Sequence, residues 1–196
     1  MSILVLTSDT LIGTPATGNI EYNGQFYGTD SNASRAQMQR LVLETSKAST
    51  SGTSVEFTGI PAWCKRLTVM FAGISTNGTG VIQIQLGTSG GYEISGYLSS
   101  TWTANTNNSA TTTGFAIRTS ITAAFTQSGH LNLTAVGSNL WVGSGVSCRT
   151  DAADSSVYSG NKTLSGTLDR VRFIGSATGS PSDTFDAGTI NILIEG

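Results

Sequence analysis

Short runs that alternate apolar and polar residues recur through most of this chain, and they constrain its fold more than any other feature. In "VIQIQLGT", residues 81–88, the side chains of Ile82, Ile84 and Leu86 lie on one side of an extended strand, while Gln83 and Gln85 lie on the other. A period of two residues is typical of a strand with one buried and one exposed face. We therefore predict a half-buried strand here, with both glutamines on its polar face.

Polar segments rich in Gly, Asn and Ser separate these runs, as turns do between strands. Of the 196 residues, 79 are Gly, Ser or Thr, which leaves few strong helix formers. The pattern predicts an all-β fold, with an antiparallel, jelly-roll-like β-sandwich in residues 51–196. The predicted strands are 55–60, 66–74, 81–88, 92–100, 114–120, 131–136, 139–148, 162–166, 168–176 and 188–195.

The part before this sandwich divides into two segments. Residues 1–17 are predicted to form an N-terminal arm, in which an apolar start at residues 3–6 precedes a turn-rich exit. Residues 18–50 are predicted to form a trimerisation and linker segment that ends in a Ser/Thr/Gly cluster.

Within the linker, Ser34 is followed three positions later by Gln37, a spacing typical of a helix N-terminus. We therefore predict a short helix over residues 35–43. The alternative is a strand, with Ala36, Met38 and Arg40 on one side.

An unusually apolar stretch, "GNIEYNGQFYGT", opens the linker at residues 18–29. Its Asn-Gly corner predicts a hairpin, and an isolated hairpin is marginally stable in water. Such a short segment cannot cover its own apolar side chains, but copies of the chain around one axis can. We predict that the following residues make contacts in a homotrimer: Ile20, Tyr22, Phe26 and Tyr27.

Charge and hydropathy argue against two classes of partner. The net charge is −2, and the ten Lys and Arg residues are scattered, so we expect no nucleic-acid binding. No run approaches the ~20 apolar residues of a membrane-spanning helix, so we expect no membrane insertion. The start "MSILVLTSDTLIG" lacks a basic region, so we do not expect a signal peptide.

Cys64 and Cys148 are predicted to be buried reduced thiols, with a long-range disulfide as the alternative.

The sequence offers few groups for catalysis. His130, the only histidine, is predicted to lie in a turn before a strand and has no partner of the kind zinc needs. Two pairs of nearby carboxylates exist, Asp151 with Asp154 and Asp183 with Asp186. Asp commonly forms turns, and we predict that role, with no catalytic residue, no metal and no cofactor. A pair acting in glycoside cleavage is the alternative.

Two polar stretches, residues 95–114 and 151–163, combine aromatic residues with Asn and Asp. Aromatic rings can stack on sugars while amides and carboxylates bond to hydroxyl groups, although the same aromatics can instead be core residues. The predicted glycan-binding residues are Tyr97, Trp102, Asn105, Asn107, Asn108, Asp154 and Tyr158.

Two parts of the chain resemble proteins of tailed bacteriophages. "GNIEYNGQFYGTDSNASR", residues 18–35, is similar to the segment G-x-[IL]-E-[YF]-[DN]-G-x-x-[YF], followed shortly by Arg, of phage structural and tail-fibre proteins. Residues 57–97, beginning "FTGIPAWCKRLTVMF", and residues 164–196, with "DTFDAGTINILIEG", look like the C-terminal β-rich domain of such virion proteins.

This resemblance implies a virion protein, commonly a trimer, whose N-terminal part attaches to other virion proteins and whose sandwich projects outward. We therefore predict a non-enzymatic short tail fibre or fibre tip that binds a bacterial surface glycan or protein. A capsid decoration or head-spike protein is the alternative within the virion. Alternatives from other classes are an envelope-polysaccharide-degrading enzyme and a free carbohydrate-binding module.

Overall fold

The computed structural model describes residues 11–196 apart from 12, 15, 24, 105–107, 124 and 177. The chain forms two compact units, residues 1–40 and residues 41–196, which are treated separately below. Within the described residues every regular element is a β-strand and every strand pair is antiparallel. The all-β prediction is therefore confirmed.

The first unit contains a three-stranded sheet in the order of the chain. Its strands are β1 (Ile20–Tyr22), β2 (Phe26–Thr29) and β3 (Arg35–Gln37). The glutamate of β1 and the arginine that begins β3 form an ion pair of 2.8 Å, which joins the outer strands. The predicted hairpin at residues 18–29 is present as β1 and β2.

The predicted helix over residues 35–43 is wrong, and the strand alternative is correct in part, because residues 35–37 and 41–43 form two separate short strands. The Asp30 carboxylate accepts hydrogen bonds of 2.9 Å from the backbone N–H groups of Asn32 and Ser34, and Ala33 has a φ of 57°. These contacts turn the chain back on itself, so that β3 pairs with β2 instead of beginning a helix. The spacing of Ser34 and Gln37 therefore does not mark a helix N-terminus here, because Asp30 holds a turn before them.

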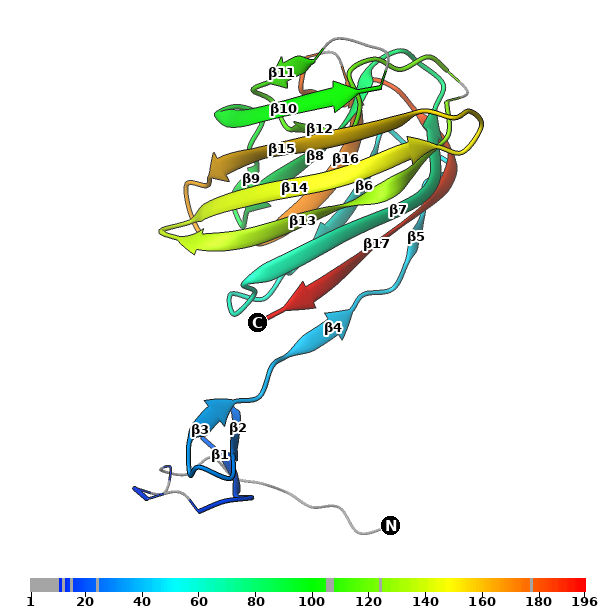
Figure 1. The fold of residues 1–196 in the computed structure, drawn as a ribbon. Coiled ribbons are helices and arrows are strands. Elements are labelled where there is room, and N and C mark those ends of the chain that lie inside the picture. Colours follow the sequence, from blue (N-terminus) through cyan, green and yellow to red (C-terminus); the bar gives the residue numbers. More distant parts are fainter. Residues whose placement is uncertain are drawn as a thin grey trace. The chain divides into compact units, whose positions relative to one another are not determined.

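The second unit contains two larger sheets (Figure 1). The nine-stranded sheet has the order β11 (Ser109–Thr111), β10 (Tyr97–Thr103), β15 (Ser155–Thr163), β14 (Leu140–Arg149), β13 (Gln127–Gly137), β7 (Arg66–Thr76), β17 (Phe185–Glu195) and β4 (Leu41–Leu43), and β5 (Lys47–Ala48) also pairs with β17. The five-stranded sheet has the order β12 (Phe115–Ala116), β8 (Val81–Thr88), β16 (Arg170–Ser176) and β6 (Ser54–Thr58), and β9 (Gly91–Tyr92) pairs with β8.

These two sheets share one hydrophobic core, which makes the unit β-sandwich-like. Phe71 of β7 meets Phe173 of β16 edge to face, with ring centroids 5.5 Å apart. Tyr97 of β10 meets Phe115 of β12 in the same way, also at 5.5 Å. The side chains of both sheets that face this core are almost fully buried.

Several predicted strand boundaries need correction. Residues 155–161 are absent from the predicted strands, but residues 155–163 form β15 in the interior of the nine-stranded sheet. Its alternation is carried by serines, and small polar residues give a weak strand signal. The predicted strand 92–100 divides into β9 and β10, and 114–120 contains only the two-residue β12. His130 lies within β13 and not in a turn.

The prediction that β8 is half-buried is also wrong, because Gln83 and Gln85 are buried. The Gln85 amide nitrogen donates to the carbonyl oxygens of Thr113 and Gly179 at 2.7 and 2.8 Å, and the Arg172 guanidinium donates to its amide oxygen. Loops from distant parts of the chain therefore cover the polar face of this strand. Their carbonyl groups satisfy the amides, which keeps the burial favourable.

Both cysteines are free thiols. Cys64 is buried, as predicted, and burial raises the pKa of its thiol to about 11. Cys148 is exposed, so the prediction of two buried thiols is wrong for this residue. Cys148 lies opposite Ser155 on β15, at an outward-facing position of the nine-stranded sheet.

Candidate functional site

The outward face of the nine-stranded sheet carries an exposed aromatic residue, Trp102, which is 50% exposed. It lies on β10, opposite Val157 of β15, and Val157 lies opposite Val146 of β14. Residues facing one another on adjacent strands project from the same face, so these three side chains form one apolar row. Both valines are also exposed. An exposed apolar group of this kind is typical of a binding surface.

A second row, two residues further along the same strands, consists of hydroxyl groups. Ser100 of β10 lies opposite Ser159 of β15, which lies opposite Ser144 of β14. The three serines are exposed, and in the part of the chain that the structure describes none of their hydroxyls forms a side-chain hydrogen bond. Each hydroxyl can therefore donate and accept a bond to a ligand.

The two rows enclose a shallow hollow of about 350 Å³, which we call the Trp102 hollow. None of its lining residues is charged. The combination of an aromatic face with neutral hydroxyl groups suits a ligand that is itself neutral, apolar on one face and rich in hydroxyls at its edges. The residues lining the hollow are Ser100, Trp102, Ser144, Gly145, Val157, Tyr158 and Ser159.

Two of the predicted glycan-binding aromatics are core residues. Tyr97 and Tyr158 are almost completely buried, and burial raises the pKa of both phenols. The Tyr158 hydroxyl lies 2.9 and 3.0 Å from the carbonyl oxygens of His130 and Val146, which share its single proton as acceptors. The Tyr97 hydroxyl accepts a 2.7 Å bond from the Leu86 N–H. Neither ring face is open to a stacking ligand.

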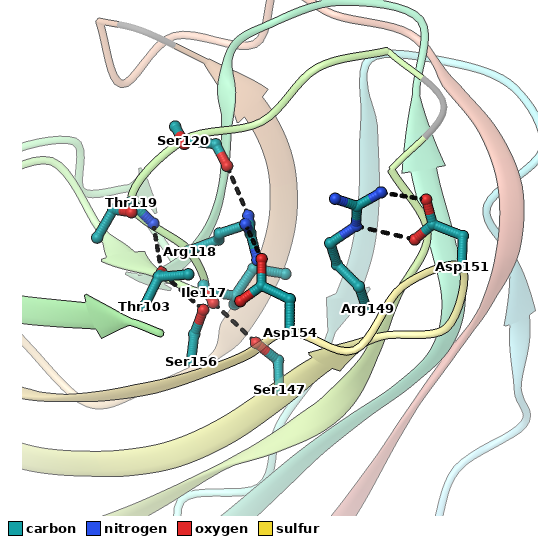
Figure 2. A network of polar contacts seen from close by, with 10 residues as sticks. All are labelled: Thr103, Ile117, Arg118, Thr119, Ser120, Ser147, Arg149, Asp151, Asp154 and Ser156. Atoms are coloured by element: carbon teal, nitrogen blue, oxygen red, sulfur yellow. Dashed lines mark hydrogen bonds and ion pairs between the residues drawn. The ribbon is translucent and has the colours of Figure 1, made fainter. Parts of the chain in front are cut away.

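Asp154 is engaged in a polar network at one end of the sandwich, which Figure 2 shows. Its carboxylate forms an ion pair with Arg118, and the two side chains are only 17% and 4% exposed. Arg118 also donates a 2.7 Å bond to the Ser120 carbonyl. The pair is therefore a structural element of this end of the sandwich.

Two of the other three carboxylates, Asp151 and Asp183, also have structural partners. Asp151 forms an ion pair with Arg149 on the opposite side of Figure 2, and the hydrogen bond from Arg149 lowers the pKa of Asp151 to about 2. A general acid in glycoside cleavage needs a raised pKa, so the lowered pKa of Asp151 argues against that role. Asp183 accepts a 2.6 Å bond from the Gly80 N–H. Asp186 is exposed on strand β17, so the predicted turn role is wrong for this residue.

Of the predicted glycan-binding residues, Trp102 and Asn108 lie at the surface near each other. Asn108 is exposed and immediately precedes β11, which pairs with β10. Continuing the register of that pair by one residue places Asn108 opposite Trp102. Asn105 and Asn107 lie outside the described residues, as does the apolar start of the N-terminal arm.

The three serines of the hollow escaped the sequence analysis. They are far apart in the chain, and serine is the second most common residue type in it. The one available signal was their alternation with apolar residues in 98–102, 142–146 and 157–159, and that signal does not indicate which strands are neighbours.

Neither a scan against protein-family models nor a search of curated proteins returned a match for this chain. The resemblance to phage virion proteins therefore stays a prediction. Among the described residues, no group of three or more His, Cys, Asp or Glu side chains could hold a metal ion. No helix of the described chain is long and apolar enough to cross a membrane.

Proposed function

We propose that this chain is a structural protein of a tailed-bacteriophage virion that holds a neutral glycan of the bacterial surface in the Trp102 hollow. The observation that carries the glycan site is the half-exposed Trp102 ring beside three outward-facing serine hydroxyls on adjacent strands. The assignment to a virion is supported by the resemblance of residues 18–35, 57–97 and 164–196 to phage proteins. In this proposal the sandwich is jelly-roll-like and its role is attachment.

The chemistry of the hollow favours a neutral sugar over other bacterial surface molecules. The C–H face of a sugar ring is apolar and can cover the indole, while its hydroxyl groups exchange hydrogen bonds with the serines. A phosphate or carboxylate would lose its hydration without gaining a cation, because no charged residue lines the hollow.

The binding experiment compares Trp102→Ala with Val136→Ala on an array of neutral and acidic bacterial oligosaccharides. Val136 is 62% exposed in β13, close to the β13–β14 turn, and it does not line the hollow. Truncating an aromatic residue at the centre of a binding site typically costs ~2 kcal/mol or more. We therefore expect Trp102→Ala to weaken binding of a neutral glycan about 30-fold, and Val136→Ala to leave it unchanged. Equal binding by both variants would contradict the proposal.

A shallow hollow of this kind binds weakly on its own, so attachment to a cell requires several copies. A dissociation constant of ~1 mM corresponds to a binding free energy of only about −4 kcal/mol. Linking several sites can raise the overall affinity by ~100-fold or more. We propose that the chain forms a homotrimer through its first unit. Ile20 and Phe26 are 66% and 45% exposed, and Tyr22 and Tyr27 are partly exposed.

Light scattering tests this assembly. We expect a molar mass of about three times the 20.3 kDa chain. The double variant Ile20→Ser/Phe26→Ser removes exposed apolar groups without touching the sandwich core, and we expect it to dissociate toward monomers. Ile94→Ser, at another exposed aliphatic residue, is the matched control. A wild-type chain that stays monomeric at high concentration would rule out the trimer.

Locating the protein on the virion distinguishes a tail-fibre protein from a capsid protein. We propose a short tail fibre or fibre tip, attached to other virion proteins through residues 1–17. Immunogold labelling of particles in negative stain is expected to mark the tail. Labelling of the capsid shell would instead establish the decoration or head-spike alternative.

A further inference from the structure

A second hollow adjoins the Trp102 hollow on the same face of the sheet. It has a volume of about 360 Å³ and involves β11, β10 and β15. The two hollows share Ser100 and Ser159, which lie opposite each other on neighbouring strands. The boundary between the hollows is therefore a pair of serines with exposed hydroxyl groups and not a wall of large side chains.

The second hollow differs in chemistry from the first. Its most exposed apolar group is Leu98, which is 67% exposed, and Ala110 of β11 lies beside it, opposite Ser100. We call it the Leu98 hollow. No aromatic face is open here, since Tyr97 is buried in the core. None of the residues that line this hollow carries a charge.

Strand geometry gives the distance that a ligand would have to span. Trp102 and Leu98 are four residues apart on β10 and project from the same face, which separates them by about 13 Å at ~3.3 Å per residue. A single sugar ring cannot contact both side chains, but linked rings can. The serine pair lies midway, where a hydroxyl close to the glycosidic bond could be bound.

We propose that the glycan extends from the Trp102 hollow across Ser100 and Ser159 into the Leu98 hollow, and that its second unit carries a methyl group. A 6-deoxyhexose or an N-acetylhexosamine meets this requirement. The methyl group packs against Leu98 and Ala110, while the hydroxyl-rich ring of the first unit stacks on Trp102. The proposal rests on the proposed glycan-binding function and adds the length and the chemical class of the ligand.

The test uses the full chain and three disaccharides whose first unit is the sugar that binds best on the oligosaccharide array. Their second units are a 6-deoxyhexose, the corresponding hexose and a hexuronic acid. The first unit alone serves as a fourth probe. Affinities are measured by calorimetry. We expect the 6-deoxy probe to bind about fourfold more tightly than the single unit, because its methyl group leaves water. We expect the uronic acid probe to bind no better than the single unit.

The variant Leu98→Ser is expected to remove this gain while leaving the affinity for the single unit unchanged. Val142→Ser, at an exposed aliphatic residue on the same face that lines neither hollow, is the matched control. Circular dichroism confirms that both variants fold. Equal affinity of wild type and Leu98→Ser for the 6-deoxy probe overturns the extended site but leaves the Trp102 hollow standing. Absence of any glycan binding by the wild-type chain overturns the proposed function itself.

Discussion

Phe173→Ala is expected to lower the free energy of unfolding by about 3–5 kcal/mol. Phe173 lies on β16, in the interior of the five-stranded sheet, and its side chain has no exposed surface. Its strand neighbours are Ile84 and Val55 on either side, and its ring meets Phe71 of the opposite sheet edge to face. Truncation therefore leaves a cavity between the two sheets that neither can easily fill.

Urea unfolding measures this loss through the fluorescence of the buried Trp141. Val136→Ala serves as the control, since it removes methyl groups from an exposed residue and is expected to change stability by no more than about 0.5 kcal/mol. A loss below about 1 kcal/mol for Phe173→Ala would show that the two sheets do not depend on this contact. The core described above would then be wrong in that region.

Asp154→Ala is expected to cost about 3–5 kcal/mol, a loss comparable to that of the core variant. The reason is electrostatic, because removal of the carboxylate leaves the Arg118 guanidinium buried without its counter-charge. Asp151→Ala is the matched control three residues away in sequence, two residues beyond the end of β14. Its ion pair with Arg149 is more exposed to water, so its loss is expected to be much smaller.

The double variant Arg118→Met/Asp154→Ala separates the charge from other roles of Asp154. Replacing both members of a buried pair by apolar groups is often neutral, so we expect the double variant to recover most of the stability that Asp154→Ala loses. Failure to recover would indicate that the loss comes from other contacts of the Asp154 or Arg118 side chain and not from an unpaired buried charge. If Asp154→Ala instead left stability unchanged and abolished release of sugar from bacterial envelopes, the carboxylate would be catalytic.

The predicted strands were most accurate where large aliphatic residues alternate with polar ones. Residues 66–74, 81–88 and 168–176 lie almost entirely within strands β7, β8 and β16. Accuracy fell where serine and glycine carry the alternation, as in β15. The helix predicted from the spacing of Ser34 and Gln37 is absent, because Asp30 holds the preceding residues in a turn.

The candidate site was only partly accessible to sequence reasoning. Tyr97, Trp102 and Tyr158 occur in similar polar surroundings, and all three were assigned to one surface. In the sheet, Tyr97 and Trp102 are an odd number of residues apart on β10, so they project from opposite faces. Of these three aromatic residues, the tertiary structure therefore leaves Trp102 at the surface, beside serines that no local pattern connects to it.

The sequence by itself determined that this protein is built from antiparallel strands, because a period of two is a local property of each segment. It also identified the apolar hairpin of the first unit. Only the tertiary structure decided which face of each strand is covered, since the covering groups come from distant parts of the chain. Gln83 and Gln85 are buried for this reason, and Trp102 is exposed for the same reason.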